Sequence, residues 1–459
     1  MTLQTRFPRQ PRRGMLLGLS APRVVAGVDA VLLLVVGFSL GGRGPLIAVG
    51  ITDVILVGSA MMRLQGRYLI EWLPLWGHWK VRGLTHQQSF RARVTTPRPS
   101  GSLALPGDAT NLRFVDVGDA TYIQDPSAGT LTAALRLEHA AMVLLDADAQ
   151  ESRVTGWSRL LSGLAGVETL SHVAVMEETI PDHDNGPVEW FLDHWTKEDD
   201  WASREYYSLL ETNQTLSSTH RTTLSVTVTC GRGGLREACT NLAAQREGLE
   251  FALRAAGLRC VGWLDEERLA RQIRGAYAPF SPLHSSTLST AGPVAIDESW
   301  GSLCHDDGFS CVLVLSEFPA VPVGPQFLHS LIFSGAARHT LTLIARVQGV
   351  DEALRQIRRE KIAVASDHRQ KQKFGQMEEM SDRTQYAAIE EREMSLLQGH
   401  ASVRVTGLLS VTAPSEESLE AAVAQVKRDA GQCACEARVL YGMQASAFVA
   451  AALPVGRAI

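Results

Sequence analysis

The sequence lacks the short motifs that mark common nucleotide-binding and metal-dependent catalytic sites. It has no G-x-x-x-x-G-K-[ST] phosphate-binding loop and no H-E-x-x-H zinc motif. Its seven cysteines are an odd number at scattered positions, which favours reduced thiols over a disulfide framework or a zinc ribbon. We therefore expect a protein that is not an enzyme and that holds no cofactor and no metal ion.

Acidic side chains are scarce in residues 1–93. This segment holds twelve Arg and Lys residues but only Asp29, Asp53 and Glu71, which gives it a net charge of +9. The whole chain carries −5, so the remaining residues carry −14. A domain of that charge repels phosphate, so we do not expect it to bind nucleic acid directly; a local basic patch around Arg355–Lys373 stays open as an exception.

Two apolar runs lie within the basic segment, Val24–Leu40 and Pro45–Met62, and the short link Gly41–Gly44 joins them. Each run is near the minimum length that spans a hydrocarbon core of about 30 Å. We therefore expect an antiparallel transmembrane hairpin in the cytoplasmic membrane. Arginines on both flanks place both termini and the bulk of the chain in the cytoplasm, because basic residues concentrate on that side. These orienting residues are Arg12, Arg13, Arg23, Arg63 and Arg67.

Two alternatives to a membrane hairpin stay open. A secretory signal peptide has the same basic start and apolar core, and a soluble protein can bury an apolar helical hairpin. The second apolar run ends in charged residues, with no secretory domain after it, and this disfavours the signal peptide.

Asp29 and Asp53 each lie inside an apolar run, within one helical turn of each other in depth when counted from the link. A carboxylate inside a membrane costs about 2.5–3.5 kcal/mol on insertion scales, so its presence requires a reason. One interpretation is contact with a polar group on a partner helix, or a proton site. The other is a hydrogen bond between the two helices, with one carboxyl protonated.

An aromatic segment follows the second run. Glu71, Trp72 and Pro74 lie in the stretch Glu71–Leu75, which we expect to fix the exit of the chain from the membrane. Trp76 and Trp79 come next and suit a membrane–water interface.

The rest of the chain alternates between strand and helix patterns. In the first half the predicted strands are 111–117, 120–124, 130–137, 140–145, 169–176, 221–229 and 258–263, and the predicted helices are 148–164, 188–212, 234–256 and 266–277. In the second half the predicted strands are 309–316, 338–347, 401–412 and 436–440, and the predicted helices are 326–333, 351–398, 415–429 and 444–453.

Both halves therefore follow the order β-α-β-β-α-β of the ferredoxin-like split motif. The predicted fold is α+β: a two-helix transmembrane hairpin followed by two ferredoxin-like halves, with a long helical insertion in the second. The predicted domains are 1–82 for the basic start and hairpin, 83–280 for the first half, 281–307 for a linker, and 308–459 for the second half with a helical arm at 351–398.

Four stretches resemble the amino-terminal half of the assembly ATPase of type IV (conjugative) secretion systems. They are SRVTGWSRLLSGLAGVETLSHVAVMEE at 152–178, REYYSLL to HRTTLSVTV at 204–228, GHASVRVTGLLSVTAPSEESLEAAVAQVKRDAG at 399–431, and QASAFVAAALPVGR at 444–457. In that ATPase the last stretch precedes the motor domain, whereas this sequence ends at Ile459 without a motor motif. The resemblance therefore gives no ATP-binding residue to this chain.

Arg13–Ser20, Arg23 and Glu71–Leu75 are similar to the "R…GLS…R" and EWLPL patterns of a membrane protein family of actinobacterial conjugative elements. Members of that family have a membrane hairpin and a similar domain without a motor. The resemblance implies an inner component of a DNA-transfer machine. The hairpin also resembles the small two-span subunit that is fused to, or paired with, the ATPase.

We therefore expect a non-enzymatic, membrane-anchored scaffold of a type IV-like conjugative DNA-transfer apparatus. Its expected partners are a separate motor ATPase, other membrane subunits, the lipid bilayer and further copies of itself. Two other functions stay open: an accessory membrane subunit of a type VII secretion system, and a membrane-bound enzyme with an unrecognised site.

Overall fold

The computed structural model describes residues 21–64, 67–92, 101–139, 142–181, 191, 195, 200–213, 218–231, 233–281, 287–319, 323–333, 337–373, 380–398 and 401–458. These residues divide into two compact units. The first is built from Gln88–Gln348 and Val403–Ile459, and the second from Pro8–Gln87 and Gly349–Ser402.

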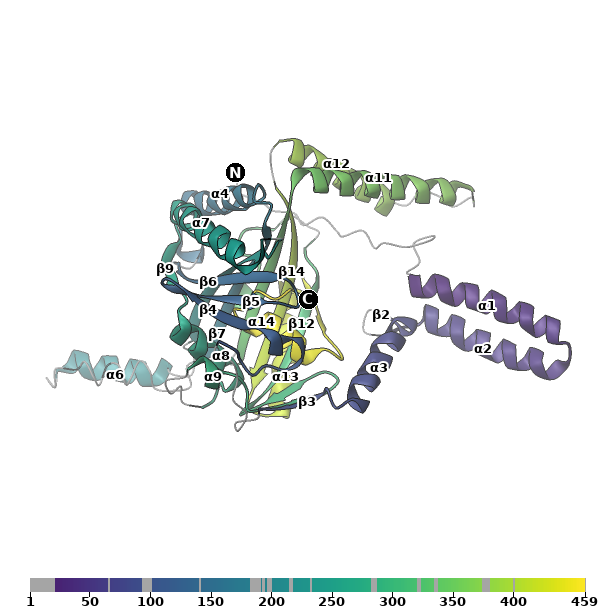
Figure 1. Ribbon diagram of the computed structural model, residues 1–459, viewed down its shortest axis with the longest axis horizontal. Coiled ribbons are helices and arrows are strands. Elements are labelled where there is room, and N and C mark those ends of the chain that lie inside the picture. Colours follow the sequence, from purple (N-terminus) through teal and green to yellow (C-terminus); the bar gives the residue numbers. More distant parts are fainter. Residues whose placement is uncertain are drawn as a thin grey trace. The chain divides into compact units, whose positions relative to one another are not determined.

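The first unit is an α+β structure around one large antiparallel sheet (Figure 1). Its strands are β3 (Ser89–Arg91), β4 (Arg113–Val117), β5 (Ala120–Asp125), β6 (Thr130–Glu138), β7 (Leu170–Pro181), β8 (Ser218–Thr229), β9 (Arg259–Trp263), β10 (Ala295–Glu298), β11 (Leu303–His305), β12 (Gly308–Glu317), β13 (Arg338–Gln348), β14 (Ser402–Ala413) and β15 (Glu436–Val439). The spatial order is β3-β10-β11-β12-β14-β13-β7-β8-β6-β5-β4, with β15 also paired to β12 and β9 also paired to β6.

The helices of this unit are α4 (Ala147–Leu164), α6 (Trp201–Asn213), α7 (Gly234–Ala255), α8 (Glu266–Tyr277), α9 (Leu288–Ala291), α10 (His329–Ile332), α13 (Glu416–Gln432) and α14 (Gln444–Ala452), with short 3-10 turns η1 (Gly107–Asn111) and η2 (Met142–Leu144). Several of them start at a polar side chain that accepts a backbone hydrogen bond, as the exposed amides of a first helical turn require. Asp146 accepts from the amide of Ala149 at the start of α4, and Ser415 forms a capping box with Ser418 at the start of α13.

The strand order repeats across the sheet. The first half runs β6-α4-β7-β8-α7-β9 along the chain and β9-β6-β8-β7 in space, and the second runs β12-α10-β13-β14-α13-β15 along the chain and β15-β12-β14-β13 in space. In each half an insertion separates the second and third strands along the chain: the α6 segment lies between β7 and β8, and a helical arm lies between β13 and β14. The two halves therefore share one topology in the described part of the chain.

The two halves become one sheet where β7 pairs with β13. The pairing is antiparallel and runs from Val173 opposite Ala345 to Thr179 opposite His339. A buried ion pair reinforces it, because Arg338 at the start of β13 donates to the carboxylate of Glu178 on β7. Arg221 on β8 lies 3.6 Å from the same carboxylate.

Apolar side chains cover both faces of the sheet. On one face α4 and α7 bury alternate residues of β6, β7 and β8, and α10 and α13 do the same over β12, β13 and β14. Figure 1 shows α4 and α7 side by side along the β6 part of the sheet. On the other face α8, α9, η1 and α14, which is buried except at Ser446, form a core that draws on both halves.

The segment after α14 crosses the first half of the sheet. The ring of His172 on β7 contacts the carbonyl oxygen of Gly456 at 2.7 Å, and Arg457 pairs with Asp125 on β5 at 2.7 Å. Burial lowers the pKa of His172, so its ring is neutral at pH 7 and donates this hydrogen bond. The tail therefore ties the end of the second half to the first.

The second unit contains two separate helical pieces. One holds α1 (Ala21–Leu40), α2 (Arg43–Met61), the two-stranded ribbon β1 (Arg63–Leu64) and β2 (Arg67–Tyr68), and α3 (Leu69–Leu84). The other is an antiparallel pair of α11 (Val350–Lys373) and α12 (Met380–Leu397) around the buried Ile357 and Ile389 (Figure 1). Ion pairs Lys361–Glu393 and Arg392–Glu360 join the two helices of this arm.

Most predicted strands and helices are present, but three expectations need correction. Within the predicted strand 140–145, Met142–Leu144 form a 3-10 turn instead, and residues 140 and 141 lie outside the described residues. The predicted linker 281–307 contains α9, β10 and β11, and the stretch 83–110, in which no strand or helix is predicted, contains β3 and η1. These strands have three or four residues each, too few to show an alternating apolar pattern. The predicted helix 188–212 is described only at Phe191, Trp195 and from residue 200 onward.

Replacing Arg338 with Met tests the buried ion pair. We expect the free energy of unfolding to fall by about 3 kcal/mol, because Glu178 would keep a buried charge with only the longer contact to Arg221. The measurement is urea denaturation of the full chain in mild detergent, followed by tryptophan fluorescence. Arg259→Met is the matched control, since Arg259 and Glu138 form an exposed pair whose loss costs at most about 1 kcal/mol. Equal midpoints for both variants would contradict the role given to Arg338.

Replacing Gly456 with Ala tests the tail. Gly456 has a φ of +63°, and a Cβ there would lie 2.4 Å from Oγ1 of Thr227. We expect a loss of about 1–3 kcal/mol and faster proteolysis of the tail. Gly431→Ala is the control, because Gly431 is in α13 with open space around it and should tolerate the change. A tail that stays protected in Gly456→Ala would refute the close packing.

Candidate membrane-anchoring site

The α1–α2 hairpin packs through small residues. Ala26 and Ala30 of α1 are buried, and a Cβ on Gly37 would lie 3.1 Å from the side chain of Val49. Small residues let two helices approach closely, as in helix pairs within membranes. The hairpin therefore buries alanine and glycine between its helices and leaves larger apolar side chains outside.

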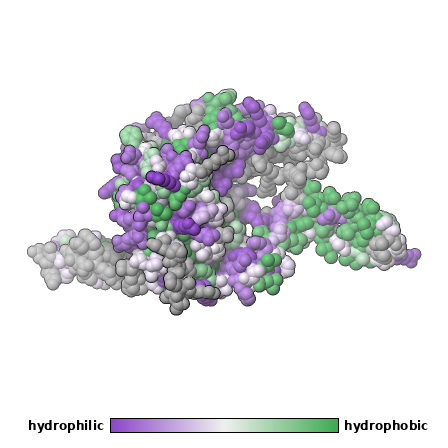
Figure 2. Space-filling view, in the orientation of Figure 1, coloured by the Kyte–Doolittle hydropathy of each residue, from purple (hydrophilic) through white to green (hydrophobic). Residues whose placement is uncertain are grey.

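Apolar side chains are exposed on both helices. The exposed set is Val25, Val28, Val31, Leu32, Leu34, Val35, Val36, Phe38, Ile47, Ile51, Val54, Ile55, Val57 and Met61. Figure 2 shows this apolar surface over α1 and α2, at the right of the view. A patch of this extent is rare on a soluble monomer and marks contact with lipid or with other proteins. Among the described residues, Pro22–Ser39 is long and apolar enough to cross a membrane, and Ile47–Met61 is a shorter apolar helix.

The two intramembrane aspartates predicted from the sequence differ in environment. Asp53 faces α1, is only 9% exposed, and has no hydrogen-bond partner for either carboxylate oxygen. Asp29 lies on the exposed side of α1, beside the buried Ala30. The two carboxyls are not hydrogen-bonded to each other, so Asp53 is an unsatisfied polar group inside an apolar hairpin.

A cation–aromatic cluster closes the base of the hairpin. In the β1–β2 ribbon, Arg63 pairs with Tyr68, and Leu64 pairs with Arg67. The guanidinium carbon of Arg63 lies 4.7 Å from the centroid of the Tyr68 ring, and that of Arg23 lies 3.9 Å from it. Arg23 also donates to the carbonyl oxygen of Ala60 at 3.0 Å. Two arginines from the two ends of the hairpin thus meet on one tyrosine.

The helix α3 carries the predicted exit residues. Glu71 is in its first turn, where a negative charge stabilises a helix, and Pro74 lies inside it. The indole of Trp72 donates to the carbonyl oxygen of Leu64 at 3.3 Å, which fixes α3 to the ribbon. The exposed Trp76 lies under Lys80, with 5.5 Å between the ammonium nitrogen and the ring centroid.

The strand β3 begins within five residues of the end of α3 and joins the large sheet. It pairs with β10, and Arg91 forms an ion pair of 2.6 Å with Asp297. The carbonyl oxygen of Gln88 accepts from the amide of Glu298, which extends the pairing. The chain that leaves the hairpin is thus part of the folded sheet.

The structure brings Arg23 and Arg63 together and places Arg67 on the opposite face of the ribbon from Arg63, by its register. Arg12 and Arg13 lie outside the described residues. Sequence reasoning did not identify Tyr68 as the residue on which the arginines meet. The spacing of Arg63 and Tyr68 in the sequence fits a tight β-hairpin. Only the register of the ribbon shows that they are cross-strand neighbours on the same face.

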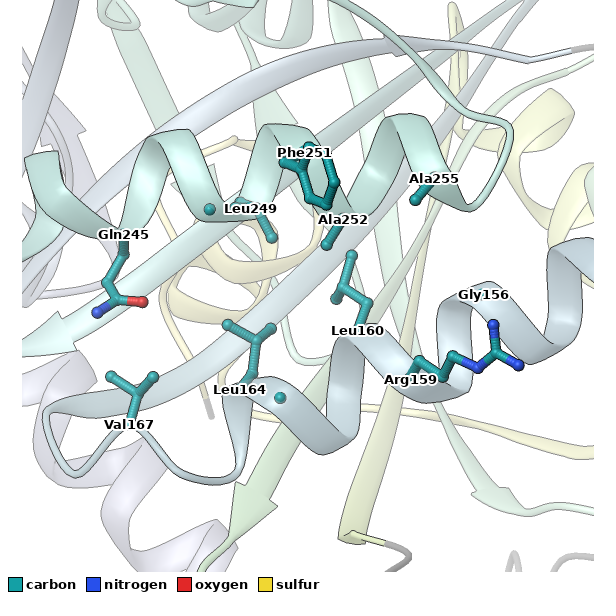
Figure 3. Close-up of a pocket in the computed structure, with 12 residues that line it drawn as sticks. Gly156, Arg159, Leu160, Leu164, Val167, Gln245, Leu249, Phe251, Ala252 and Ala255 are labelled. Carbon is teal, nitrogen blue, oxygen red and sulfur yellow. The ribbon is translucent and has the colours of Figure 1, made fainter.

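A separate groove of about 400 Å³ lies between α4 and α7 (Figure 3). Leu160 and Leu164 of α4 face Leu249 and Ala252 of α7 across it. Its lining is mainly apolar, and it contains no cysteine, histidine or carboxylate. The groove therefore shows no converging catalytic groups.

Other candidate chemistry is also weak in the described part of the chain. The string Gly37-Phe-Ser-Leu-Gly41 matches the G-x-S-x-G pattern, but its Ser39 is in α1 and donates to the carbonyl oxygen of Val36, whereas a nucleophile elbow needs a strand-to-helix turn. All seven cysteines are free, and burial raises the pKa of Cys435 to about 11, which keeps that thiol protonated. The described residues contain no group of His, Cys, Asp and Glu suited to a metal ion.

No protein-family model matches this chain, and no curated protein matches it.

Replacing Asp53 with Leu tests whether α2 enters a membrane. We expect the apparent free energy of inserting α2 to improve by about 3–4 kcal/mol, because aspartate opposes insertion near a helix centre and leucine favours it. The measurement is a glycosylation-reporter assay of membrane insertion. Thr52→Leu is the control, since Thr52 is exposed and already bonded to Ala48 within its helix. Insertion that Asp53→Leu does not change would show that Asp53 lies outside the hydrocarbon core.

Proposed function

We propose that this chain is a non-enzymatic, membrane-anchored structural subunit of a type IV-like conjugative DNA-transfer apparatus. The α1–α2 hairpin inserts in the cytoplasmic membrane among the helices of other subunits. The sheet domain stays in the cytoplasm and docks a separate motor ATPase and other copies of the chain.

The observation that carries this proposal is the exposed apolar surface of the hairpin above a cationic and aromatic base. Exposing so many apolar side chains to water is unfavourable in free energy, whereas contact with lipid or with partner helices removes them from water. Arginine, tyrosine and tryptophan at the base match the composition of a membrane–water interface on the cytoplasmic side. The chain continues from the hairpin through α3 into β3, which is built into the sheet, and this supports the proposal that the hairpin anchors the domain.

The repeated topology supports the subunit class. We propose that each half is a ferredoxin-like unit, since the spatial orders β9-β6-β8-β7 and β15-β12-β14-β13 are those of a split β-α-β motif in an antiparallel sheet. Two such units after a membrane hairpin are what the resemblance to conjugative-element membrane proteins leads us to expect. The stretches that carry the resemblance to the assembly ATPase fall on α4–β7, α6–β8, β14–α13 and α14.

The arm formed by α11 and α12 is the surface that we assign to the ATPase. Ile362, Met394 and Leu397 are exposed on it among charged residues. Protein–protein interfaces have an apolar core within a polar rim, and we propose that these three side chains supply that core.

Affinity purification from detergent tests the proposal. We expect a tagged full-length chain to retain a motor ATPase and membrane subunits of a DNA-transfer system, identified by mass spectrometry. Ile362→Glu with Met394→Glu should reduce ATPase recovery at least about tenfold, because a charge in a docking face removes apolar contact. Ser203→Glu on the surface of α6 is the control and should retain the ATPase.

Two outcomes would contradict the proposal. Purified chain that hydrolyses ATP without a partner would make it an enzyme. Recovery of small secreted helical-hairpin proteins with a type VII ATPase would assign the chain to a type VII secretion system instead.

A further inference from the structure

The base of the hairpin concentrates positive charge in a small volume. The guanidinium groups of Arg23 and Arg63 both lie within 5 Å of one ring centroid, that of Tyr68. They come from residues forty positions apart, and the hairpin and the β1–β2 ribbon bring them together. The two positive charges repel each other, and a bound anion beside them would offset that repulsion.

The described part of the chain supplies no carboxylate to either arginine. Arg23 donates to the carbonyl oxygen of Ala60, and Arg63 donates to the hydroxyl of Tyr68. No ion pair joins either side chain to Asp or Glu among the described residues. Each guanidinium has five N–H donors, so most of the donors in this cluster remain for an external group.

The two guanidinium groups of the cluster favour a phosphate-type anion as the ligand. A guanidinium binds phosphate with two parallel hydrogen bonds, and both guanidinium carbons lie within 5 Å of the centroid of the Tyr68 ring. The surroundings favour a lipid as the source of that phosphate. Val25 on α1, Met61 at the end of α2 and Met62 after it are exposed near the cluster, where acyl chains would lie against them.

We propose that Arg23, Arg63 and Tyr68 form a binding site for the headgroup phosphate of an anionic phospholipid. The lipid neutralises the two arginines and holds the ends of α1 and α2 at the level of the headgroups. This inference rests on the proposed membrane anchorage. Basic residues in general concentrate on the cytoplasmic side of a membrane, whereas here two of them would form a specific ligand site.

Quenching of tryptophan fluorescence by brominated lipids tests the site, because Trp72 and Trp76 follow it directly. The full-length chain is reconstituted in vesicles of dibrominated phosphatidylglycerol mixed with phosphatidylcholine, and the relative binding of the two lipids is measured. We expect phosphatidylglycerol to bind more tightly. We expect Arg23→Gln and Arg63→Gln each to reduce that preference about fivefold, the effect of one basic residue near an anionic surface.

Two further variants separate a built site from diffuse attraction. Arg43→Gln removes one positive charge from the link at the opposite end of the hairpin and should leave the preference unchanged. Arg23→Lys keeps the charge but loses the planar fork, so it should keep only part of the preference. Thermal melting of each variant confirms that it folds.

Several outcomes would overturn the site. The inference is wrong if Arg23→Gln and Arg63→Gln bind phosphatidylglycerol like the parent chain, or if Arg43→Gln loses as much. Displacement of the brominated lipid by inorganic phosphate would show that the ligand is the free anion. If the chain resists extraction from membranes by carbonate but shows no preference for phosphatidylglycerol, only the lipid site is refuted. If carbonate releases the chain from membranes, the proposed membrane anchorage is refuted as well.

Discussion

The pairing of β7 with β13 is the constraint on which the rest of the sheet depends. Each half presents an edge strand that is largely buried on both faces, and an open edge of that kind associates with other chains unless it is covered. Joining the two edges removes both, and the ion pair of Arg338 with Glu178 fixes the register. The helix α14 and the tail after it then lie across strands of both halves, so neither half completes its core alone.

Sequence patterns predicted the parts of this structure in which one physical signal is strong. The alternation in β8 and the helical spacing in α4 and α13 are long enough to identify strand and helix. The apolar stretch 140–145 was ambiguous, because a short apolar run has no diagnostic period. The strands β3, β10 and β11 are defined by their partners and not by their own residues, so the predicted linker was wrong.

The same limit applies to the candidate site. The basic flanks and the tryptophans are visible in the sequence, and so are the two aspartates within apolar runs. The sequence does not show that the two aspartates have different environments, because a shift of one position along α1 decides whether Asp29 faces α2 or the outside of the hairpin. The meeting of Arg23 and Arg63 on Tyr68 depends on the packing of two helices and the register of a ribbon, which no local pattern specifies.

The tail after α14 also affects the order in which parts of the molecule can fold during synthesis. Its partners are far earlier in the chain: Gly456 meets His172, and Arg457 meets Asp125, more than 280 residues away. The apolar hairpin emerges from the ribosome long before these contacts can form, and contacts so distant in sequence form slowly. If the hairpin is the membrane anchor that we propose, it reaches the bilayer before the sheet is complete, and the first half of the sheet then lacks the tail while the hairpin is already inserted.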